Sequence, residues 1–514
     1  MGDRHQFLAV DLGAESGRGE IVTLADGKVS MEEIHRFGTR NVQLGKTRHW
    51  DFPAIYAEVV EAMKVCSARG VRPASVSIDT WGVDFGLLGA DGALLGNPVH
   101  YRDARTDGIH AHAALIMPIA DIFMATALHT MPINSLFQLH AMQRKHSPLL
   151  ELAETFLMMP DLLAYFLTGV KACELSIAQT SQLIGTDCKW AAHIIGRFSL
   201  PRSMFPRLIA PASVIGPMTP EVAALTGMGD VPLVACASHD TSAAVAAVPA
   251  AGDDWAFLSC GTWSILGRMV DQPIATRACY EAGFTNEYTY GGWYLARNIL
   301  GLWLIQELRR KWDTPGDPWG YERMTAEAVK AAGAVGSRVG AGGSKAGSGA
   351  TGAGGPLVDV SDPRLLAPPD MEAALMELIA QTGQAAPQGR GQLLLCVLES
   401  LALEYAWGLD TIQKLSTARP GRLYIVGGGI RNKLLCQLTA NACGVEVLAG
   451  ADQCTALGNA LGQALALGIL KNRDEIRQVM RDSSQIATYE PKDQPAWQAK
   501  REQYAKLQGS KTWH

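Results

Sequence analysis

The segment ACASHDTSAAV, residues 235–245, places the carboxylate of Asp240 next to His239 within a run of small side chains. The apolar stretch VPLVACA precedes it and predicts a buried strand, so Asp240 is expected at a strand end. A carboxylate held there can act as a general base that accepts a proton from a hydroxyl group. A structural alternative exists, because an aspartate ahead of a helix can accept backbone N–H bonds as its N-cap. This segment alone favours the N-cap.

Two glycine-containing turns offer backbone N–H groups that could bind phosphate. VDLGAESGR, residues 10–18, follows Asp11 with a tight turn, although a plain strand–turn explains it equally well. It is not a Walker A loop, because no GK[ST] follows, and it is not a GxGxxG motif. LSCGTWS, residues 258–264, repeats the pattern and adds the Thr262 hydroxyl. In VGGGIRN, residues 426–432, three glycines would let the backbone approach a flat ligand, but their spacing excludes a dinucleotide-binding motif.

The elements that must position these turns recur in both halves of the chain. A strand and a small-residue turn open each half, in FLAVDLGAESGRGEIV and in WAFLSCGTWSILGRMV, and a helix later leads to ASVSIDTWGVDF or RLYIVGGGIRN. Alternating strands and helices predict α/β architecture, and the recurrence predicts duplicated domains, although α/β proteins in general show similar echoes. Helices are predicted at about 53–68 and at 393–415, the second with one apolar face packed on a sheet.

Composition excludes several classes of protein. A net charge of −5 gives no basic field, so no nucleic-acid partner is predicted. The 514 residues exceed the roughly 250–300 at which single cores stop growing, so two domains are expected. The cysteines show no CxxC pairing, which predicts reduced thiols. With no signal-peptide pattern and no apolar run of about 18 residues, the sequence predicts a cytoplasmic protein without a membrane partner.

The predicted domains are residues 1–248 and 249–490, with a boundary near 245–252, and a polar, helical C-terminal tail at 491–514. Residues 110–228 of the first domain are expected to be predominantly helical. In the second domain, residues 331–355 are almost entirely Gly, Ala and Ser. Such a segment cannot bury enough apolar surface to order itself, so it predicts a flexible surface insertion.

Eight segments together carry a family resemblance that none carries alone. They are VDLGAESGR, SIDTWGVDF, YRDARTDG, MMPDLLAYFLTG, ASHDTSAAV, LSCGTWS, NILGLWLIQE and IVGGGIRN, in this order from about residue 7 to 490. The ordered set resembles the FGGY carbohydrate kinases. The resemblance implies an actin-like, ribonuclease H-like fold of two duplicated α/β domains with an interdomain cleft, in which ATP and a sugar bind.

The resemblance also implies residue roles where the motifs match. The family's ATP-binding positions match Ala14, Glu15, Ser16, Gly17, Arg18, Thr262, Gln306 and Gly428, and Asp11 matches a position near Mg²⁺. The sugar-binding positions match Gly82, His239, Asp240, Thr241 and Asn298, and Asp240 matches the proton acceptor. Asp84 and Asp103, the latter with Arg105, are expected to line or brace the sugar site, because carboxylates and guanidinium groups recognise polyols. The alternative for these three is an internal ion pair.

Two residues depart from the family pattern. Glu15 stands where a small hydroxyl residue is usual, so we expect weaker ATP binding unless its side chain points away. Cys260 stands where serine is common, and we expect little effect because backbone amides do most of the binding.

The activity implied is the ATP-dependent phosphorylation of L-rhamnulose at its 1-hydroxyl, with Mg²⁺ as cofactor, in L-rhamnose catabolism. The alternatives are another ketose or polyol kinase, acting on L-fuculose, xylulose or glycerol, and a non-catalytic actin-like ATPase. Retention of Asp240 and of the WGVDF segment argues against the ATPase, which needs no sugar pocket. The sequence leaves the oligomeric state open.

Overall fold

The computed structural model describes residues 4–340 and 355–509. The chain divides into two compact units, and neither is continuous in sequence. The first comprises the residues up to Ala251, Met269–Leu295 and Gln453–Gln485; the second comprises Gly252–Arg268, Ala296–Asp452 and the chain from Ile486 onward. The continuous domains and the cleft predicted from the sequence stay predictions.

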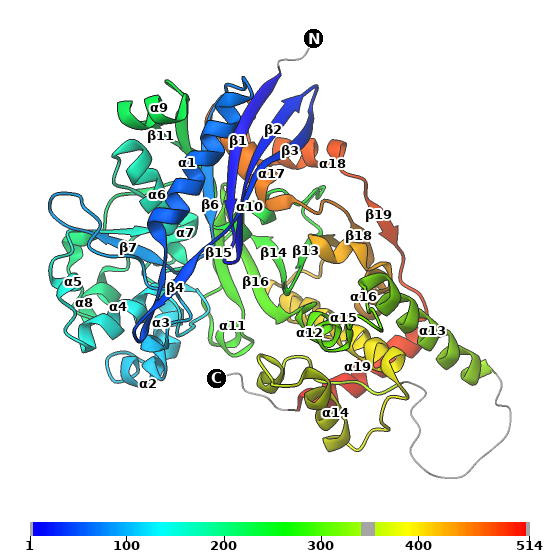
Figure 1. Cartoon of the computed structure of the whole chain (residues 1–514). Coiled ribbons are helices and arrows are strands. Elements are labelled where there is room, and N and C mark those ends of the chain that lie inside the picture. The colour runs from blue at the N-terminus through cyan, green and yellow to red at the C-terminus, as the bar shows by residue number, and fades with distance from the viewer. Residues whose placement is uncertain (1–3, 341–354, 510–514) are drawn as a thin grey trace. The chain divides into compact units, whose positions relative to one another are not determined.

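A six-stranded sheet forms the centre of the first unit, with the order β11–β12–β6–β1–β2–β3 (Figure 1). β6 is parallel to both β1 and β12, and the remaining neighbours are antiparallel. The strands are β1 (His5–Leu12), β2 (Ser16–Ala25), β3 (Lys28–Gly38), β6 (Val76–Thr80), β11 (Ser213–Pro217) and β12 (Pro232–Ala235). Asp26 and Gly27 join β2 to β3 with φ of 52° and 73°, as a two-residue hairpin turn requires.

Helix α1 (Phe52–Ala68) covers the face of this sheet that carries the even-numbered residues of β1 (Figure 1). The helix approaches closely at Gly19, where a Cβ atom would lie 2.8 Å from Cβ of Ala62. Asp51 caps the helix by accepting an N–H bond from Ala54, and seven of its residues, Ile55, Val59 and Met63 among them, are buried. The predicted helix at about 53–68 is therefore confirmed.

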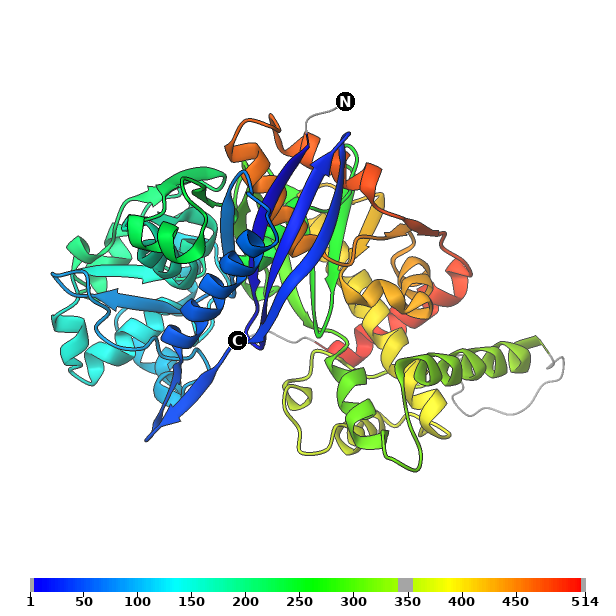
Figure 2. The ribbon, with the colours of Figure 1, turned by 45° about the horizontal axis from the view of Figure 1, so that its top comes forward.

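Helix α17 (Cys454–Ala466) covers the opposite face, and Figures 1 and 2 show it beside the blue strands although it comes from late in the chain. Asn459 donates a hydrogen bond of 2.6 Å to Asp79. α17 also packs on α10 (Asp240–Ala246), where a Cβ atom at Gly458 would lie 2.0 Å from the carbonyl oxygen of Ala243. The late segment thus completes the first unit.

The other elements of the first unit flank this sheet. The region 110–228, predicted to be predominantly helical, also contains four short strands, of which β8 (Thr155–Met158) is a fully buried run of four residues. The strands are β4 (Asn41–Leu44), β5 (Thr47–Trp50), β7 (Phe85–Leu88), β8 (Thr155–Met158), β9 (Cys173–Glu174), β10 (Leu208–Ile209) and β15 (Thr285–Thr289). The helices are α2 (Ile109–Ala113), α3 (Ile119–Thr126), α4 (Ser135–Arg144), α5 (Pro148–Glu151), α6 (Met159–Thr168), α7 (Leu175–Gln179), α8 (Ala192–Arg197), α9 (Pro220–Thr226), α11 (Arg277–Glu281) and α18 (Arg473–Ser483).

A second sheet, with the order β15–β16–β14–β13–β17–β18–β19, repeats the plan of the first. β13 and β14 form an antiparallel hairpin and β17 lies parallel to β13, as β1, β2 and β6 do. The predicted duplication is therefore confirmed. Its further strands are β13 (Trp255–Cys260), β14 (Trp263–Val270), β16 (Gly292–Leu300), β17 (Arg422–Val426), β18 (Glu446–Ala449) and β19 (Ala487–Tyr489). The helices of the second unit are α12 (Trp303–Trp312), α13 (Tyr321–Gly340), α14 (Met371–Gln381), α15 (Arg390–Ser416), α16 (Lys433–Cys443) and α19 (Gln494–Gln508).

Helix α15 corrects two expectations from the sequence. It is the one described helix long and apolar enough to cross a membrane, and 89% of its most apolar window is buried within the protein, as in a core helix. It is buried on nearly every side rather than on one face. The reason is that its acidic residues are paired internally: Glu404 accepts bonds from Arg297, Tyr504 and Gln508.

The predicted glycine-rich insertion begins later than expected. Helix α13 continues to Gly340, so residues 331–340 are helical. Residues 341–354 lie outside the described residues, and the insertion stays a prediction. Residues 494–508 of the predicted polar tail form α19, in which Trp497 and Tyr504 are buried.

Candidate functional site

The carboxyl ends of β1, β6 and β12 meet at one edge of the first sheet. Trp81 N–H donates to Leu12 at 3.1 Å, and Thr80 N–H donates to Ser238 at 2.9 Å. The segments of Asp11, Gly82 and His239 therefore lie together at this edge. Ligands of α/β sheets characteristically bind outside the carboxyl ends of the strands.

Asp240 is the first residue of α10 and not its N-cap, which is His239. Its Oδ1 atom accepts bonds from the backbone N–H and the hydroxyl of Thr241. Among the described residues, no hydrogen-bond donor reaches its Oδ2 atom, and 31% of the side chain is exposed. Asp240 thus presents a carboxylate with one oxygen fixed and one oxygen available.

His239 lies between two carboxylates. Its Nδ1 atom is 3.0 Å from Oε2 of Glu287 on β15, and its Nε2 atom is 3.5 Å from Oδ1 of Asp240. Burial disfavours the charged imidazole, but the contact with Glu287 and the charges of Glu287 and Asp240 outweigh it and raise the pKa of His239. The ring is therefore held toward its protonated form.

Three aspartates at this edge disfavour one another's ionisation. Burial, then the charge of Asp240, raises the pKa of Asp11 to about 6. Burial, then the charge of Asp11, raises the pKa of Asp79 well above its ordinary value. Burial also raises the pKa of Asp240, and the charge of His239 opposes this most strongly. A cation bound here would relieve this repulsion.

Glu174 fixes the backbone ahead of Asp240. Its fully buried carboxylate accepts bonds from Ser176, Ile177 and Ser238, and it caps α7. The Ser176 hydroxyl in turn accepts a bond of 3.3 Å from the backbone N–H of His239. The position of the His239 backbone is therefore set by α7 as well as by the sheet.

Gly82 lies where a side chain has no room. A Cβ atom there would lie 2.9 Å from Cγ2 of Thr180, whose hydroxyl accepts a bond from Val83. The backbone can therefore approach a ligand at Gly82 without a side chain between them.

Asp84 and Asp103 brace the protein interior. Asp84 is fully buried and accepts bonds from Trp50, Trp81, Gln138 and the backbone of Tyr101. Burial raises the pKa of Asp84 to about 6 in spite of these donors. Asp103 accepts backbone bonds from Arg48 and Arg105. The Arg105 guanidinium bonds Gln138, with no direct ion pair to either aspartate among the described contacts.

The first predicted phosphate turn joins β1 to β2. Gly13 N–H donates to Ser16, and the Thr39 hydroxyl donates to the Gly13 carbonyl. Among the described residues, no protein acceptor is recorded for the N–H groups of Ala14 and Glu15, and the Glu15 side chain is exposed. Gly17 is required because a Cβ atom would lie 2.4 Å from Phe37. Arg18 lies opposite Asp11, and its charge opposes part of the rise in the pKa of Asp11.

The second turn joins β13 to β14 in the second unit. The exposed Thr262 hydroxyl and the Gln306 amide of α12 are hydrogen-bonded to each other at 3.1 Å, so the structure brings these two predicted residues together. Gly428, in the turn after β17, is exposed with open space around its Cα atom. Cys260 is buried beneath this turn, and burial raises its pKa to about 11. Asn298 lies exposed on β16.

Sequence models of one family cover most of the chain. The N-terminal domain of the FGGY family of carbohydrate kinases matches residues 6–246, and its C-terminal domain matches residues 256–467. This chain belongs to the FGGY family of carbohydrate kinases. Among its FGGY relatives, a rhamnulokinase of Bacteroides thetaiotaomicron is 38% identical over 498 residues, which cover 96% of this chain and 98% of the relative. A rhamnulokinase of Oceanobacillus iheyensis is 34% identical over 488 residues, covering 94% and 97%.

Solved structures show the same fold. The gluconate kinase from Lactobacillus acidophilus has a TM-score of 0.80 at 17% identity, covering 99% of this chain and 98% of its own. The ligand-bound xylulose kinase from the same organism has a TM-score of 0.79 at 18% identity, covering 99% of both chains. The predicted fold class, the actin-like duplicated α/β fold, is confirmed by these neighbours.

Sequence reasoning missed Glu287, Glu174 and Asp79 of this FGGY kinase. Asp79 lies in SIDTWGVDF, one of the family segments, directly opposite Asp11 in the parallel pairing of β1 and β6. The place of Asp79 in this segment was a signal from which sequence reasoning could have found the residue. Glu287 and Glu174 reach His239 only through tertiary packing and have no local signal.

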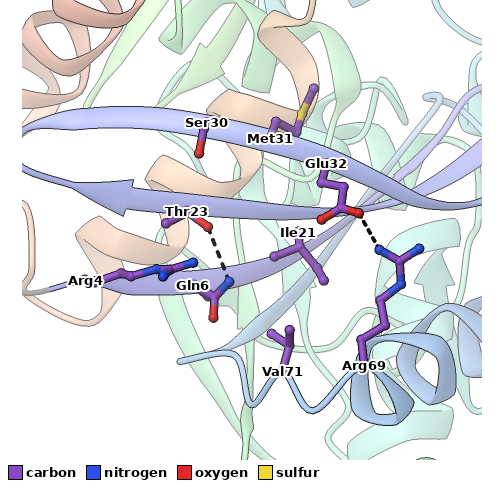
Figure 3. Close-up of a pocket in the computed structure, with 9 residues that line it drawn as sticks. All are labelled: Arg4, Gln6, Ile21, Thr23, Ser30, Met31, Glu32, Arg69 and Val71. Carbon is purple, nitrogen blue, oxygen red and sulfur yellow. Dashed lines mark hydrogen bonds and ion pairs between the residues drawn. The ribbon is translucent and has the colours of Figure 1, made fainter.

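A pocket of about 460 Å³ lies elsewhere on the first unit, on the sheet face that α1 covers (Figure 3). Arg69, just after α1, pairs with Glu32 of β3 across it, and Gln6 bonds Thr23. Two of the charged groups that line the pocket, Arg69 and Glu32, thus neutralise each other. The remaining lining residues are Arg4, Ile21, Ser30, Met31 and Val71. None of the predicted site residues lines this pocket.

Proposed function

We propose that this FGGY kinase transfers the γ-phosphoryl group of ATP to the 1-hydroxyl of L-rhamnulose, with Asp240 as the general base. The observation that carries the proposal is the Asp240 carboxylate, fixed through Oδ1 at the carboxyl edge of the sheet with Oδ2 available. The choice of sugar is supported by the name rhamnulokinase of relatives that are 31–38% identical over nearly the whole chain.

In this proposal, Oδ2 of Asp240 accepts the hydroxyl proton as the sugar oxygen attacks the γ-phosphorus. Burial raises the pKa of Asp240 and the charge of His239 opposes that rise, which favours the ionised carboxylate that a general base needs. General-base catalysis contributes about 10²–10⁴-fold, which corresponds to roughly 3–5 kcal/mol of activation free energy. Positioning and charge stabilisation supply the rest, as in phosphoryl transfer generally.

The substrates are assigned to residues of both units. Gly82, His239, Thr241 and Asn298 bind the sugar in this proposal, and Asp84 and Asp103 support the loops around it. ATP is bound by the turn Ala14–Arg18 of the first unit and by Thr262, Gln306 and Gly428 of the second. The N–H groups of Ala14 and Glu15 support this, because they have no recorded protein acceptor among the described residues.

Mg²⁺ fits the residues at this edge. Magnesium prefers oxygen ligands and commonly uses only one or two carboxylates, together with substrate phosphates. Oδ1 of Asp79 is buried without a hydrogen-bond partner, and Asp11 lies opposite it. The described residues hold no cluster of three or more His, Cys, Asp or Glu that could cage a metal ion. Asp11, supported by Asp79, would hold Mg²⁺, which when bound supplies positive charge to the phosphates.

We also propose a cytoplasmic location. ATP is a cytoplasmic cosubstrate, and all ten cysteines are free thiols in the structure.

The test compares Asp240→Asn with wild type in an assay of ADP release over L-rhamnulose, L-fuculose, D-xylulose and glycerol. We expect wild type to turn over L-rhamnulose fastest, and the variant to lose at least about a hundredfold in kcat while still binding ATP. The matched control is Asp230→Asn, because Asp230 is an exposed carboxylate whose ion-pair partner among the described residues is Arg72. Unchanged turnover in Asp240→Asn contradicts the assignment of the base. Faster turnover of another sugar corrects the substrate, and sugar-independent ATP hydrolysis contradicts the kinase assignment.

A further inference from the structure

We propose that Glu287 is a positioning residue of the phosphoryl-transfer site, which holds the His239 imidazole so that its Nε2 atom stays beside Asp240. This inference rests on the proposed role of Asp240. Glu287 touches neither the sugar nor ATP in this proposal and acts only through His239.

The geometry forms a chain of three side chains from two elements. Glu287 of β15 approaches Nδ1 of His239 to 3.0 Å, and the opposite ring nitrogen lies 3.5 Å from Asp240 at the start of α10. An imidazole with a carboxylate at each nitrogen can satisfy both only when both nitrogens carry protons. Both contacts are ion pairs, and Nδ1 is buried without an in-line hydrogen bond, so the two carboxylates hold the ring between them through its charge.

Glu287 is itself held rigidly. The Tyr294 hydroxyl of β16 donates to the same Oε2 atom at 2.8 Å, and it also lies 3.0 Å from the Ser242 hydroxyl of α10. Only 12% of the Glu287 side chain is exposed, and its recorded partner of opposite charge among the described residues is His239. Removing a carboxylate from water is costly unless it is paired and hydrogen-bonded. The ion pair with His239 therefore offsets part of the cost of burying the Glu287 carboxylate.

The charges around His239 come from several elements. Glu287 on β15, Asp240 on α10 and Glu174 ahead of α7 all favour its protonation. Asp11 on β1 and Asp79 on β6 interact with Asp240, and Tyr294 on β16 bonds Glu287. A protonated His239 is the strongest influence that opposes the rise in the pKa of Asp240. Glu287 thereby keeps a cation beside the base.

The experiment uses Glu287→Gln in the full-length protein, because glutamine keeps the shape and removes the charge. Without substrates, NMR titration of ¹³C-labelled histidines follows His239, whose signal is assigned by its absence in His239→Gln. We expect the titration midpoint of His239 to fall by at least about one pH unit, since an opposite charge within hydrogen-bond distance shifts a pKa by that much or more. With the sugar that wild type phosphorylates fastest, we expect kcat to fall about tenfold or more, a larger factor than the rise in KM.

Two further variants separate positioning from a merely structural role. Tyr294→Phe removes a bond to the same oxygen without removing the charge, so we expect it to leave the His239 midpoint within a few tenths of a unit. Glu287→Asp keeps the charge and should restore much of the midpoint. A folded Glu287→Gln variant with an unchanged midpoint and unchanged kcat overturns the inference, as does a lower melting temperature with an unchanged midpoint. Failure of the proposed function is seen separately, as a wild type that phosphorylates none of the sugars.

Discussion

The backbone at Gly429 passes directly over the side chain of Cys260, where a Cβ atom at residue 429 would lie 2.2 Å from Sγ. Gly429→Ala must therefore push the turn after β17 away from β13, and overpacking of this kind costs about 1–3 kcal/mol. We expect this variant to show a lower melting temperature and weaker ATP binding, measured by thermal unfolding and calorimetric titration.

Gly428→Ala is the matched control for this contact. A Cβ atom at residue 428 would meet no atom within 4 Å, so we expect the wild-type melting temperature. Weaker ATP binding by a Gly428→Ala variant that melts normally would support the proposed contact between this residue and ATP. If Gly429→Ala melts and binds like wild type, the steric argument is wrong.

We expect the main effect of Asp84→Ala to be a lower free energy of unfolding rather than weaker sugar binding. The substitution leaves the N–H groups of Trp50, Trp81 and Tyr101 without this acceptor. The Gln138 amide keeps the carbonyl oxygens of Val83 and Ile133 as acceptors. Unsatisfied buried donors each cost about 1–3 kcal/mol, so we expect a loss of about 3 kcal/mol or more in the free energy of unfolding. Asp91→Ala, in an exposed turn, is the control and should be nearly neutral. A stable Asp84→Ala variant with weakened sugar binding would show instead that Asp84 contacts the sugar.

Glu20 makes stability depend on pH. Burial, then the charge of Asp11, raises the pKa of Glu20 from 4.5 to about 7. The folded protein therefore holds this proton more tightly than the unfolded chain, and the stability it contributes is full below pH 4.5 and lost as the pH rises through about 7. A shift of this size corresponds to about 3 kcal/mol. Glutamine cannot ionise, so Glu20→Gln removes this loss of stability. We expect the melting temperature of the variant to exceed that of wild type at pH 8, and the difference between them to shrink toward pH 5.

Glu33→Gln is the control for the pH experiment. Glu33 is the exposed cross-strand neighbour of Glu20, and its bond with Arg36 lowers its pKa. This variant should show a smaller gain in melting temperature at pH 8 than Glu20→Gln, because the charge of Glu33 raises the pKa of Glu20 less than burial and Asp11 do. An equal gain in both variants would mean that the general negative charge of this sheet, and not the burial of Glu20, sets the pH dependence.

Local sequence patterns predicted the turns of the site but not the residues that support them. Asp240 and Gly82 lie shortly after apolar strands, and Thr262 lies in a turn marked by glycine, so the apolar pattern of the sequence indicates where these turns are. The family resemblance then supplied their roles. Glu287 and Asn459 lie far from Asp240 in sequence and reach the site only when β15 and α17 pack against the rest of the first unit. No local pattern reports such a contact.

Helix α15 shows why the pattern of charges can mislead. Glu399 and Glu404 interrupt its apolar sequence and suggest a solvent-exposed face. In the structure both are buried, paired with Lys500 and Arg297 from distant parts of the second unit. A charged residue in a sequence predicts exposure only when its partner is water, and the partner is decided by tertiary structure.

The return of α17 to the first sheet has a consequence for synthesis on the ribosome. Gln463 accepts a bond from Ser75 and donates to the Leu8 carbonyl, and Asn459 donates to Asp79, all in the buried interior. A nascent chain that has emerged only as far as Ala251 therefore carries an N-terminal sheet with one apolar face uncovered. We expect that sheet to need protection by chaperones until α17 (Cys454–Ala466) has been translated.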